Sequence, residues 1–459
     1  MKEKDLLRRF LKRNRQQRLV VHCLGDAMVD EYFKVKVNRI SPEFPMPIMS
    51  SQRAVPTTRP GGAANVAHQF RHFNVDARLF CFWDAYAAAV YKEHSLVVDS
   101  AWGTSCCLPV KRRFLDGTTQ ITRHDIEMPL CGYTEQELDL NVRRFRNAIA
   151  GQPKPDIAIL SDYDKGFFSS DMNFLELYEG VTTIVDPKRG PLKKWKGCTI
   201  FKPNAKEATE LSGSTNWREQ SKIFQNALEC EAVVITFGGE KVAGIWRDEL
   251  FEYRPNRPVH VESVIGAGDC FAAFFALAIG YGFTVSEASE IAWNAGAVYV
   301  QRNMNRPIIP AEVSWDGIVE PQDLSRRDFK LVFTNGCFDL LHEGHLSTLR
   351  FAKSKGDRLV VAVNTDASIK RLKGAGRPIK PLDQRMAVLA ALEMVDFVVS
   401  FDEDTPRQVI EQICPDVLVK GSDWQTGTIV GADIVPEVYR APVLEGLSTT
   451  RFVEQMPVP

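Results

Sequence analysis

The sequence predicts two consecutive α/β domains, each built on a mostly parallel sheet. Short apolar runs alternate with amphipathic segments along most of the 459 residues, which is the pattern of strands that alternate with helices in such sheets. The alternation stops between Ser314 and Phe329, where turn-forming and charged residues show no sustained period. We therefore expect a first domain over residues 1–316, a linker over residues 317–329 and a second domain over residues 330–459.

The composition excludes several classes of protein. A net charge of −1 argues against a protein that coats nucleic acid, and no run of about 18 apolar residues predicts a membrane span. The N-terminus is charged, lacks the apolar core of a signal peptide and predicts a short amphipathic helix. None of the ten cysteines forms a Cys-x-x-Cys pair. We expect a reduced, cytoplasmic protein without structural zinc, with metal binding by cysteines as the weaker alternative.

The elements of the first domain follow from its apolar runs. The clearest helices are expected at residues 63–73 and 269–278. Strands are expected at residues 19–24, 157–160, 183–185, 199–201 and 233–236.

The second domain shows a cleaner alternation. Strands are expected at residues 331–333, 358–364, 397–401 and 417–419, and helices at residues 345–355, 383–393 and 406–413. This is a small doubly wound sheet, whose ligand site lies at the carboxyl ends of the strands.

The most informative motif is the run from Thr334 to His345, which reads Thr-Asn-Gly-Cys-Phe-Asp-Leu-Leu-His-Glu-Gly-His. It joins a strand to a helix, so His342 and His345 lie at a helix N-terminus, where backbone N–H groups and the helix dipole favour phosphate. With the amides of the Asn335-Gly336 turn, they are expected to stabilise the α-phosphate of a nucleoside triphosphate during nucleotidyl transfer. Packed histidines or a metal site are the alternatives for this spacing.

A second glycine turn precedes the apolar helix of the first domain. Gly266, Ala267 and Gly268 would form a nest of backbone N–H groups for a transferred phosphoryl group, and Asp269 would take the proton of a sugar hydroxyl. An ordinary turn is the alternative, because Gly-x-Gly-Asp alone is weak evidence.

The second domain resembles the cytidylyltransferase-like nucleotidyltransferases, which share a His-x-Gly-His motif, and in particular the branch that adenylylates heptose 1-phosphate. Further matching segments are residues 363–366, 370–374, 377–378, 384–385, 395–396, 404–406, 415–423 and 447–450.

This resemblance implies a nucleotide pocket and a phosphate contact in the second domain. Lys353, or Lys355 in its place, would hold a substrate phosphate. A helix N-cap is the alternative for the Ser/Thr cluster. The implied nucleotide and triphosphate contacts are Thr334, Asn335, Gly336, Phe338, Asp366, Arg385, Ser448, Thr449 and Thr450.

The first domain resembles the ribokinase-like sugar kinases through Gly25-Asp26, residues 60–67 and residues 204–207. Residues 25–30, 39–43, 160–166 and 185–188 are similar to the heptose 7-phosphate kinase branch, which is commonly fused ahead of the adenylyltransferase. Asn204 and Glu207 would organise magnesium and phosphate, with a helix capping box as the alternative. No direct protein ligand to the metal is expected beyond a water-mediated contact of Glu207. The implied contacts to the sugar and its phosphate are Asp26, Gly61, Gly62, Asn65, Lys111, Arg113, Arg123 and Asp162.

The first domain departs from its family at two places. Ser263 and Ile265 stand where the family has Asp-x-Thr, and residues 82–107 match poorly where the family feeds a small β lid over the sugar. Since Asp269 and both glycines persist, we expect an active kinase, with a scaffold role as the alternative.

Together the resemblances imply a bifunctional enzyme that makes ADP-heptose from ATP with Mg²⁺. The first half would phosphorylate D-glycero-D-manno-heptose 7-phosphate at C1, a separate phosphatase would remove the 7-phosphate, and the second half would transfer AMP to heptose 1-phosphate. The product would feed lipopolysaccharide core assembly. Another sugar or polyol phosphate, or CTP in place of ATP, remains an alternative. A homodimer is expected, without nucleic-acid or membrane partners.

Overall fold

The computed structural model describes two compact units, Met1–Ile308 and Ile309–Pro459, and each is considered by itself. No helix in the described part of the chain is long and apolar enough to cross a bilayer. The described residues are 2–51, 55–98, 108–117, 119–127, 135–168, 174–256, 258–302, 305–314, 316–421 and 429–442.

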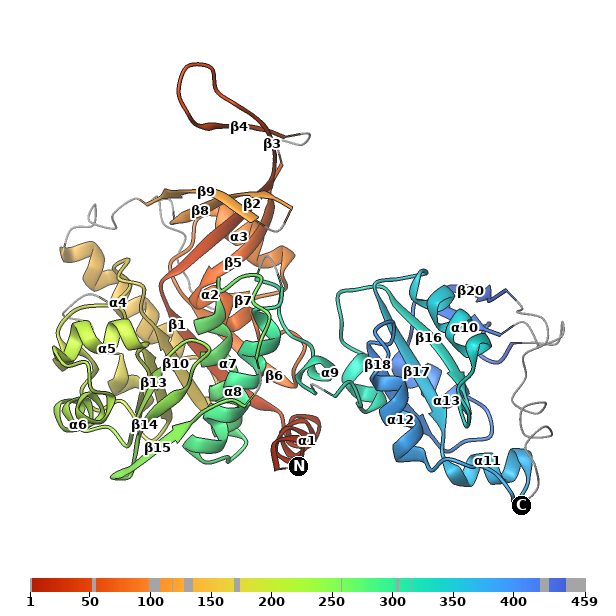
Figure 1. The fold of residues 1–459 in the computed structure, drawn as a ribbon. Helices are drawn as coiled ribbons and strands as arrows, with labels where there is room; N and C mark the ends of the chain where they lie inside the picture. The colour runs from red at the N-terminus through yellow and green to blue at the C-terminus, as the bar shows by residue number, and fades with distance from the viewer. Residues whose placement is uncertain are drawn as a thin grey trace. The chain divides into compact units, whose positions relative to one another are not determined.

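A nine-stranded sheet forms the centre of the first unit (Figure 1). Neighbouring strands from β13 to β7 are parallel, whereas β14 and β15 are added antiparallel at one edge. The strands, in spatial order, are β15 (Glu249–Tyr253), β14 (Val242–Trp246), β13 (Ala232–Thr236), β12 (Ile200–Phe201), β11 (Thr182–Asp186), β10 (Ile157–Ser161), β1 (Leu19–Gly25), β6 (Val75–Phe80) and β7 (Val97–Val98).

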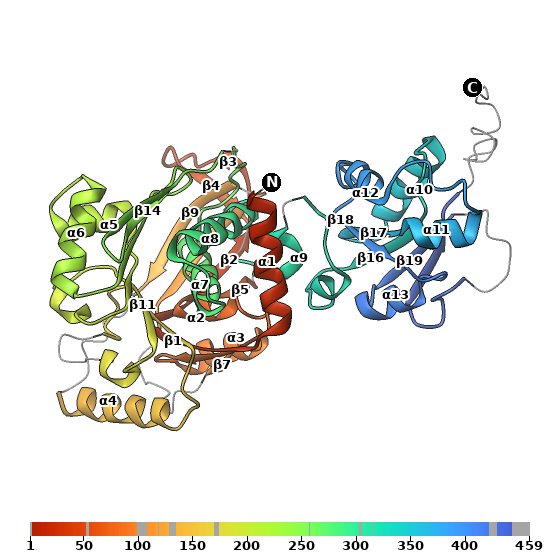
Figure 2. The same ribbon diagram turned by 90° about the horizontal axis from the view of Figure 1, so that it is seen from below.

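Helices cover both faces of this sheet (Figure 2). One layer contains α2 (Ala63–His68), α7 (Ala267–Gly280) and α8 (Val285–Tyr299), and α1 (Lys2–Gln16) packs on α8. Phe10 of α1 is fully buried, and Arg9 on the outer face of α1 donates to Glu287 Oε1 at 2.9 Å. The remaining helices of this unit are α3 (Ala85–Glu93), α4 (Glu135–Ala150), α5 (Ala205–Ser212), α6 (Trp217–Leu228), η1 (Leu175–Tyr178) and η2 (Leu192–Trp195).

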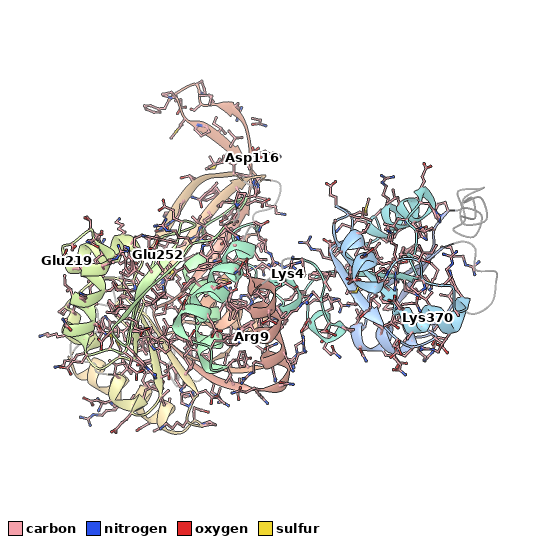
Figure 3. All side chains as sticks on the ribbon, turned by 60° about the horizontal axis from the view of Figure 1, so that its bottom comes forward. Lys4, Arg9, Asp116, Glu219, Glu252 and Lys370 are labelled. Atoms are coloured by element: carbon pink, nitrogen blue, oxygen red, sulfur yellow. The ribbon has the colours of Figure 1, made fainter. Side chains whose placement is uncertain are left out.

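A four-stranded sheet rises from the carboxyl end of β1 and forms a lid (Figure 1). Its order is β5 (Thr57–Gly62), β2 (Ala27–Lys34), β8 (Val110–Asp116) and β9 (Thr119–Ile126). A hairpin of β3 (Lys36–Ile40) and β4 (Pro47–Ser50) projects from it, and Lys36 Nζ pairs with Asp116 Oδ1 at 2.9 Å near its base (Figure 3). Because β2 directly follows β1, the lid begins beside the ligand edge of the central sheet.

The second unit contains a five-stranded parallel sheet, β18-β17-β16-β19-β20. Apolar side chains fill both faces: residues of α10 and α12 pack on one, and residues of α13 and η3 on the other. The strands are β16 (Leu331–Gly336), β17 (Arg358–Asn364), β18 (Phe397–Phe401), β19 (Val417–Lys420) and β20 (Glu437–Arg440). The helices are α9 (Pro310–Val313), η3 (Pro321–Leu324), α10 (Glu343–Lys353), α11 (Asp366–Lys373), α12 (Leu382–Ala390) and α13 (Arg407–Ile413).

Residues 317–329, which the sequence predicts to be a linker, pack into the second unit. Leu324 is fully buried in its core with Val319 and Phe329. Val319 N donates to Val398 O at 3.0 Å, and Val398 N donates to Gly317 O at 2.8 Å. The apolar positions of this segment are too irregularly spaced to show a period, so its packing was not visible in the sequence.

The expected strands are present in both units, and the predicted α/β class is confirmed. The helix expected over residues 63–73 is shorter, because α2 ends at His68 and a series of turns follows. The amphipathic helix expected at the N-terminus extends to Gln16.

Candidate active sites

The first candidate site lies where the parallel strands of the central sheet end. Gly25 closes β1, Ser161 closes β10 and Asp186 closes β11, and α7 begins above them with Gly266 as its N-cap. The carboxyl ends of parallel strands and a helix N-terminus therefore meet here, which is the usual ligand edge of such a sheet.

Asp269, in the first turn of α7, is buried and has both carboxylate oxygens occupied. Asn65 Nδ2 of α2 donates to Oδ2 at 2.7 Å, and the Tyr163 hydroxyl donates to Oδ1. Burial raises the pKa of Asp269 to about 6, while the two hydrogen bonds lower it. At neutral pH Asp269 is therefore an ionised carboxylate that is more basic than an exposed aspartate, as a general base requires.

The Gly266 turn fits only glycine. Its φ of +73° lies in the left-handed region. A Cβ at Gly266 would also come within 2.6 Å of both Asn65 Nδ2 and Tyr299 Oη. Ala267 and Gly268 continue as the first residues of α7; Ala267 N donates to Val264 O at 3.2 Å, and Gly268 N–H has no intrahelical acceptor by position. The turn directly precedes Asp269, and its use as a phosphate nest stays a prediction.

Gly61 and Gly62 bring α2 and the lid together. They pair with Met28 and Ala27 of β2, and a Cβ at Gly61 would approach Asp30 Oδ2 to 3.0 Å. Gly62 has a φ of +59° and is the N-cap of α2. The pair lets two elements approach closely, and it lies three to four residues before Asn65.

Asp26 forms its hydrogen bonds mainly with backbone N–H groups. Its carboxylate accepts hydrogen bonds from the N–H groups of Tyr163, Lys165 and Phe167 at 2.8, 3.0 and 2.9 Å. Burial nevertheless raises the pKa of Asp26 to about 6. Its predicted contact with a sugar hydroxyl would use the remaining lone pairs of the carboxylate and stays a prediction.

Asp162, the other acidic residue predicted to contact the sugar, is also committed within the protein. Lys194 Nζ lies 3.0 Å from its Oδ2, and Asp164 N donates to its Oδ1 at 2.8 Å. A sugar contact of Asp162 would therefore have to share the carboxylate with Lys194 and Asp164 N, and it stays a prediction.

Asn204 and Glu207 form the capping box of α5. Asn204 Oδ1 accepts from Glu207 N at 3.0 Å, and Glu207 Oε2 accepts from Asn204 N at 3.0 Å. Glu207 Oε1 also pairs with Lys188 Nζ at 2.9 Å. Nearby, Lys202 Nζ lies 2.9 Å from Asp186 Oδ1. Burial raises the pKa of Asp186 to about 7, Lys202 lowers it, and Glu207 raises it further. A set of charges thus surrounds the ends of β11 and β12.

Three basic residues of the lid were expected to contact a sugar phosphate, and the structure gives each of them different surroundings. Arg113 is buried in an ion pair with Asp30. Lys111, on the same strand, has its Nζ 5.5 Å from the centre of the Tyr163 ring. Arg123 of β9 is exposed and pairs with Asp125. Lys111 and Arg123 are the more available for an incoming phosphate, whereas Arg113 is part of the fold of the lid.

The second candidate site lies at the start of α10. His342 is the N-cap residue, and the His342 and His345 rings lie 3.9 Å apart, centre to centre. Phe338, with a φ of +46°, places its ring 5.2 Å from His345. Burial, followed by the nearby His342 and Lys373, lowers the pKa of His345 to about 4, and burial lowers that of His342. Both imidazoles are therefore neutral near pH 7.

One ring nitrogen of this pair awaits a partner. His345 Nδ1 is buried and has no hydrogen-bond partner among the described residues. A buried nitrogen in this state is costly unless a ligand or water satisfies it. Together with the free N–H groups at the start of α10, it forms a cluster of donors suited to phosphate oxygens.

The end of β16 completes this site. Thr334 is buried, and Gly336 is packed against the Phe338 ring, which would lie 3.1 Å from a Cβ there. The side-chain oxygen of Asn335 accepts from Lys420 Nζ at the end of β19. Since β16 and β19 are neighbours on opposite sides of the point where the strand order reverses, this contact marks the ligand crevice of the sheet.

Arg385 holds the walls of this crevice together. Its guanidinium donates to the carbonyls of Cys337, Asn364 and Lys380 at 2.7, 2.9 and 2.9 Å and to Asp366 Oδ1 at 2.7 Å. Its side chain is 1 % exposed. Arg385 and Asp366 thus lie next to the end of β16, where the Arg385 guanidinium is engaged with backbone carbonyls, and their contact with a nucleotide stays a prediction.

The structure does not bring Lys353 to this site. It ends α10, about 15 Å along the helix from the start, and its Nζ pairs with Asp396 and donates to Asp357 O at 2.8 Å. Lys355 lies over the Phe351 and Tyr439 rings, 4.4 and 4.9 Å from their centres. Ser448, Thr449 and Thr450 lie outside the described residues.

Sequence reasoning missed several residues that shape the two sites. Tyr163 and Asn305 in the first unit, and Asp339 and Lys420 in the second, contact predicted site residues or the loops that carry them. Tyr163, Asp339 and Lys420 stood in segments quoted in the sequence analysis, which was the available signal. Asn305 had none, because its contact with Asp30 joins residues 275 positions apart.

Comparison with known proteins gives a family match in each half of the chain. Residues 179–311 match the pfkB family of carbohydrate kinases, and residues 333–442 match the cytidylyltransferase-like family. The first unit shares the fold of phosphofructokinase-2 from Escherichia coli in complex with fructose-6-phosphate, with a TM-score of 0.51, 17 % identity and coverage of 63 % of this chain and 95 % of that one.

Relatives that span the whole chain join the two matches. The bifunctional protein HldE of Shewanella denitrificans is 34 % identical over 470 residues, covering 95 % of this chain and 97 % of that protein. The HldE protein of Caulobacter vibrioides is 35 % identical over 478 residues, with coverages of 95 % and 96 %. The chain therefore belongs to the HldE family of bifunctional proteins, in which a pfkB-type carbohydrate kinase precedes a cytidylyltransferase-like domain.

Proposed function

We propose that the chain makes ADP-heptose in two steps. The first unit transfers the γ-phosphoryl group of ATP to the C1 hydroxyl of D-glycero-D-manno-heptose 7-phosphate. The second unit transfers AMP from ATP to heptose 1-phosphate and releases pyrophosphate. The observation that carries the proposal is the pairing of a buried carboxylate, Asp269, with a glycine nest in one unit, and of two neutral imidazoles with a helix N-terminus in the other.

In the kinase step Asp269 takes the proton of the sugar hydroxyl as the new bond to phosphorus forms. The N–H groups of residues 266–268 and the positive end of α7 hold the charge of the transferred group. Lys111 and Arg123 of the lid bind the 7-phosphate: Arg123 is exposed, and Lys111 is partly buried beside the Tyr163 ring without an ion pair as close as that of Arg113 with Asp30.

Magnesium enters with the nucleotide. No group of three or more His, Cys, Asp or Glu side chains in the described part of the chain is arranged to hold a metal. Mg²⁺ usually keeps several waters and binds through phosphates and one or two carboxylates. Glu207 through a water and Asp186 are the carboxylates that would hold it, and the ion would neutralise charge on the phosphates.

In the adenylyl step the attacking oxygen belongs to a phosphate that is already ionised, so no general base is needed. The imidazole N–H groups of His342 and His345 and the amides at the start of α10 donate to the α-phosphate as its charge grows. Asp366, Thr334 and the end of β16 line the nucleotide pocket, and Ser448, Thr449 and Thr450 contact the triphosphate.

Further parts of the proposal concern partners. The bisphosphate product of the first step must lose its 7-phosphate before the second, which calls for a separate phosphatase. We place both ATP-dependent steps in the cytoplasm. The chain would form a homodimer through the β3–β4 hairpin of the lid, where Ile40, Phe44 and Met46 are 62 %, 67 % and 56 % exposed.

Product analysis by mass spectrometry tests the proposal. The whole protein is given ATP and Mg²⁺ with either heptose 7-phosphate or heptose 1-phosphate, and the expected products are heptose 1,7-bisphosphate and ADP-heptose. Turnover of the second substrate alone would indicate that the first unit serves as a scaffold. Preference for CTP, or for another sugar or polyol phosphate, would overturn the assigned substrates.

A further inference from the structure

Tyr163 lies in a loop whose backbone is held by the carboxylate of Asp26. It follows β10, and the carboxylate of Asp26 accepts the N–H groups of Tyr163, Lys165 and Phe167. Asp164, the next residue, has a φ of +58° and donates to Asp162. Three hydrogen bonds to one buried carboxylate hold the loop in a single conformation, so the direction of the Tyr163 side chain is set by the fold.

The hydroxyl of Tyr163 is one of two donors to Asp269. The other donor, Asn65, is itself oriented because its Oδ1 accepts from Gln69 Nε2 at 3.0 Å. The carboxylate plane of Asp269 is thus fixed from both sides. Each carboxylate oxygen can accept a second hydrogen bond, which leaves a defined direction for the sugar hydroxyl.

The ring of Tyr163 meets the lid. Lys111 Nζ of β8 lies 5.5 Å from the ring centre, within the range of a cation–π interaction. The Tyr163 side chain therefore contacts both Asp269, the proposed general base, and strand β8 of the lid.

We propose that Tyr163 is a positioning residue of the kinase, which orients the Asp269 carboxylate through its hydroxyl and supports the lid through its ring. The inference rests on the proposed kinase function. It assigns the two halves of one side chain to two separable effects, on the chemical step and on sugar binding.

The charged and titratable groups around Asp269 make the first effect measurable. Asp30 raises the pKa of Asp269, and Lys202 lowers it. The charge of Asp269 in turn raises the pKa values of Asp186 and of the buried Tyr299 hydroxyl. Tyr163 and Asn65 are the hydrogen-bond donors that favour the charged form. Without the Tyr163 hydroxyl, Asp269 holds its proton to higher pH, and less of it is active as a base.

Tyr163→Phe removes the hydroxyl and keeps the ring. We expect kcat of the kinase to fall roughly tenfold and the acidic limb of its pH profile to move up by about one pH unit. KM for heptose 7-phosphate should stay within about twofold of wild type, since the ring remains. Tyr163→Leu removes both parts and should in addition raise that KM several-fold.

The control is Tyr178→Phe, which removes another buried hydroxyl, one that lies 3.2 Å from His22 Nδ1. Thermal unfolding of every variant reports whether the first unit is folded, and adenylyltransferase activity reports the same for the second unit. A wild-type acidic limb retained by Tyr163→Phe would overturn the positioning role, as would the same shift in Tyr178→Phe. If the wild-type protein does not phosphorylate heptose 7-phosphate, the proposed kinase function is wrong, and the positioning role of Tyr163 in that reaction falls with it.

Discussion

At the start of α7, a buried carboxylate accepts two hydrogen bonds beside a glycine nest; at the start of α10, two neutral imidazoles lie ring to ring without a carboxylate between them. Both helix N-termini are suited to phosphate. Under the proposed function, this difference follows from the nucleophile in each reaction. A sugar hydroxyl must lose a proton, so a negative charge has to be kept where a phosphate arrives. A sugar phosphate is already ionised, so donors suffice.

The largest difference between the two sites is expected from a substitution of Asp269. Asp269→Asn keeps the size of the side chain but cannot accept the proton, so kinase kcat should fall by about 10³-fold or more, while adenylyl transfer is unchanged. ADP release with heptose 7-phosphate measures the first activity, and pyrophosphate release with heptose 1-phosphate the second.

The matched control for this variant is Asp248→Asn, an exposed position with a φ of +69° that asparagine also tolerates. Kinase activity retained by Asp269→Asn would mean that the first unit uses another base.

The opposite loss is expected at the second site. His345→Ala removes a donor to the α-phosphate, and adenylyl transfer should fall by about 10²- to 10³-fold with the kinase unaffected. If pyrophosphate release persists at the wild-type rate, the two imidazoles are packed side chains rather than part of the reaction.

Arg385 tests whether a residue predicted to bind the nucleotide instead stabilises the fold of the second unit. Because its guanidinium is engaged with three backbone carbonyls, Arg385→Ala should lower the free energy of unfolding of the second unit by about 3 kcal/mol. Urea unfolding followed by hydrogen exchange in α12 gives this value. Exposed Arg350→Ala should change it by less than about 0.5 kcal/mol. A large rise in KM for ATP without loss of stability would restore the nucleotide contact predicted from the sequence.

The smallest effect concerns pH. The folded-state pKa of His345 is lowered from 6.5 to about 4, so the unfolded chain binds a proton that the folded site excludes. The stability contribution is complete above pH 6.5 and is lost as the pH falls from 6.5 to 4.

After allowance for partial exposure, this loss should amount to about 1–2 kcal/mol. Denaturant midpoints of the second unit at several pH values measure it. His345→Gln should flatten the dependence, whereas exposed His124→Gln should not; equal curves for wild type and His345→Gln would contradict the shifted pKa.

Sequence patterns gave the strands and the two glycine turns because each depends on residues a few positions apart. They also pointed to Asp269, His342 and His345 as site residues through local spacing at helix starts, and these roles stay predictions. The contacts that orient these groups join distant residues, as Tyr163 and Asp269 show, and no local period reports them. Lys353 is a different case: the helix expected over residues 345–355 already put it near the C-terminal end, and α10 has it as its last residue.

The backbone pairing between Gly317, Val319 and Val398 has a practical consequence. β18 is an edge strand of the five-stranded sheet, and open edges invite pairing with another molecule. A version of the second unit that started at residue 330 would leave part of this edge bare and would remove Leu324 and Phe329 from beneath it. Such a fragment should self-associate, so the adenylyltransferase half is best isolated with its chain beginning ahead of Ile309.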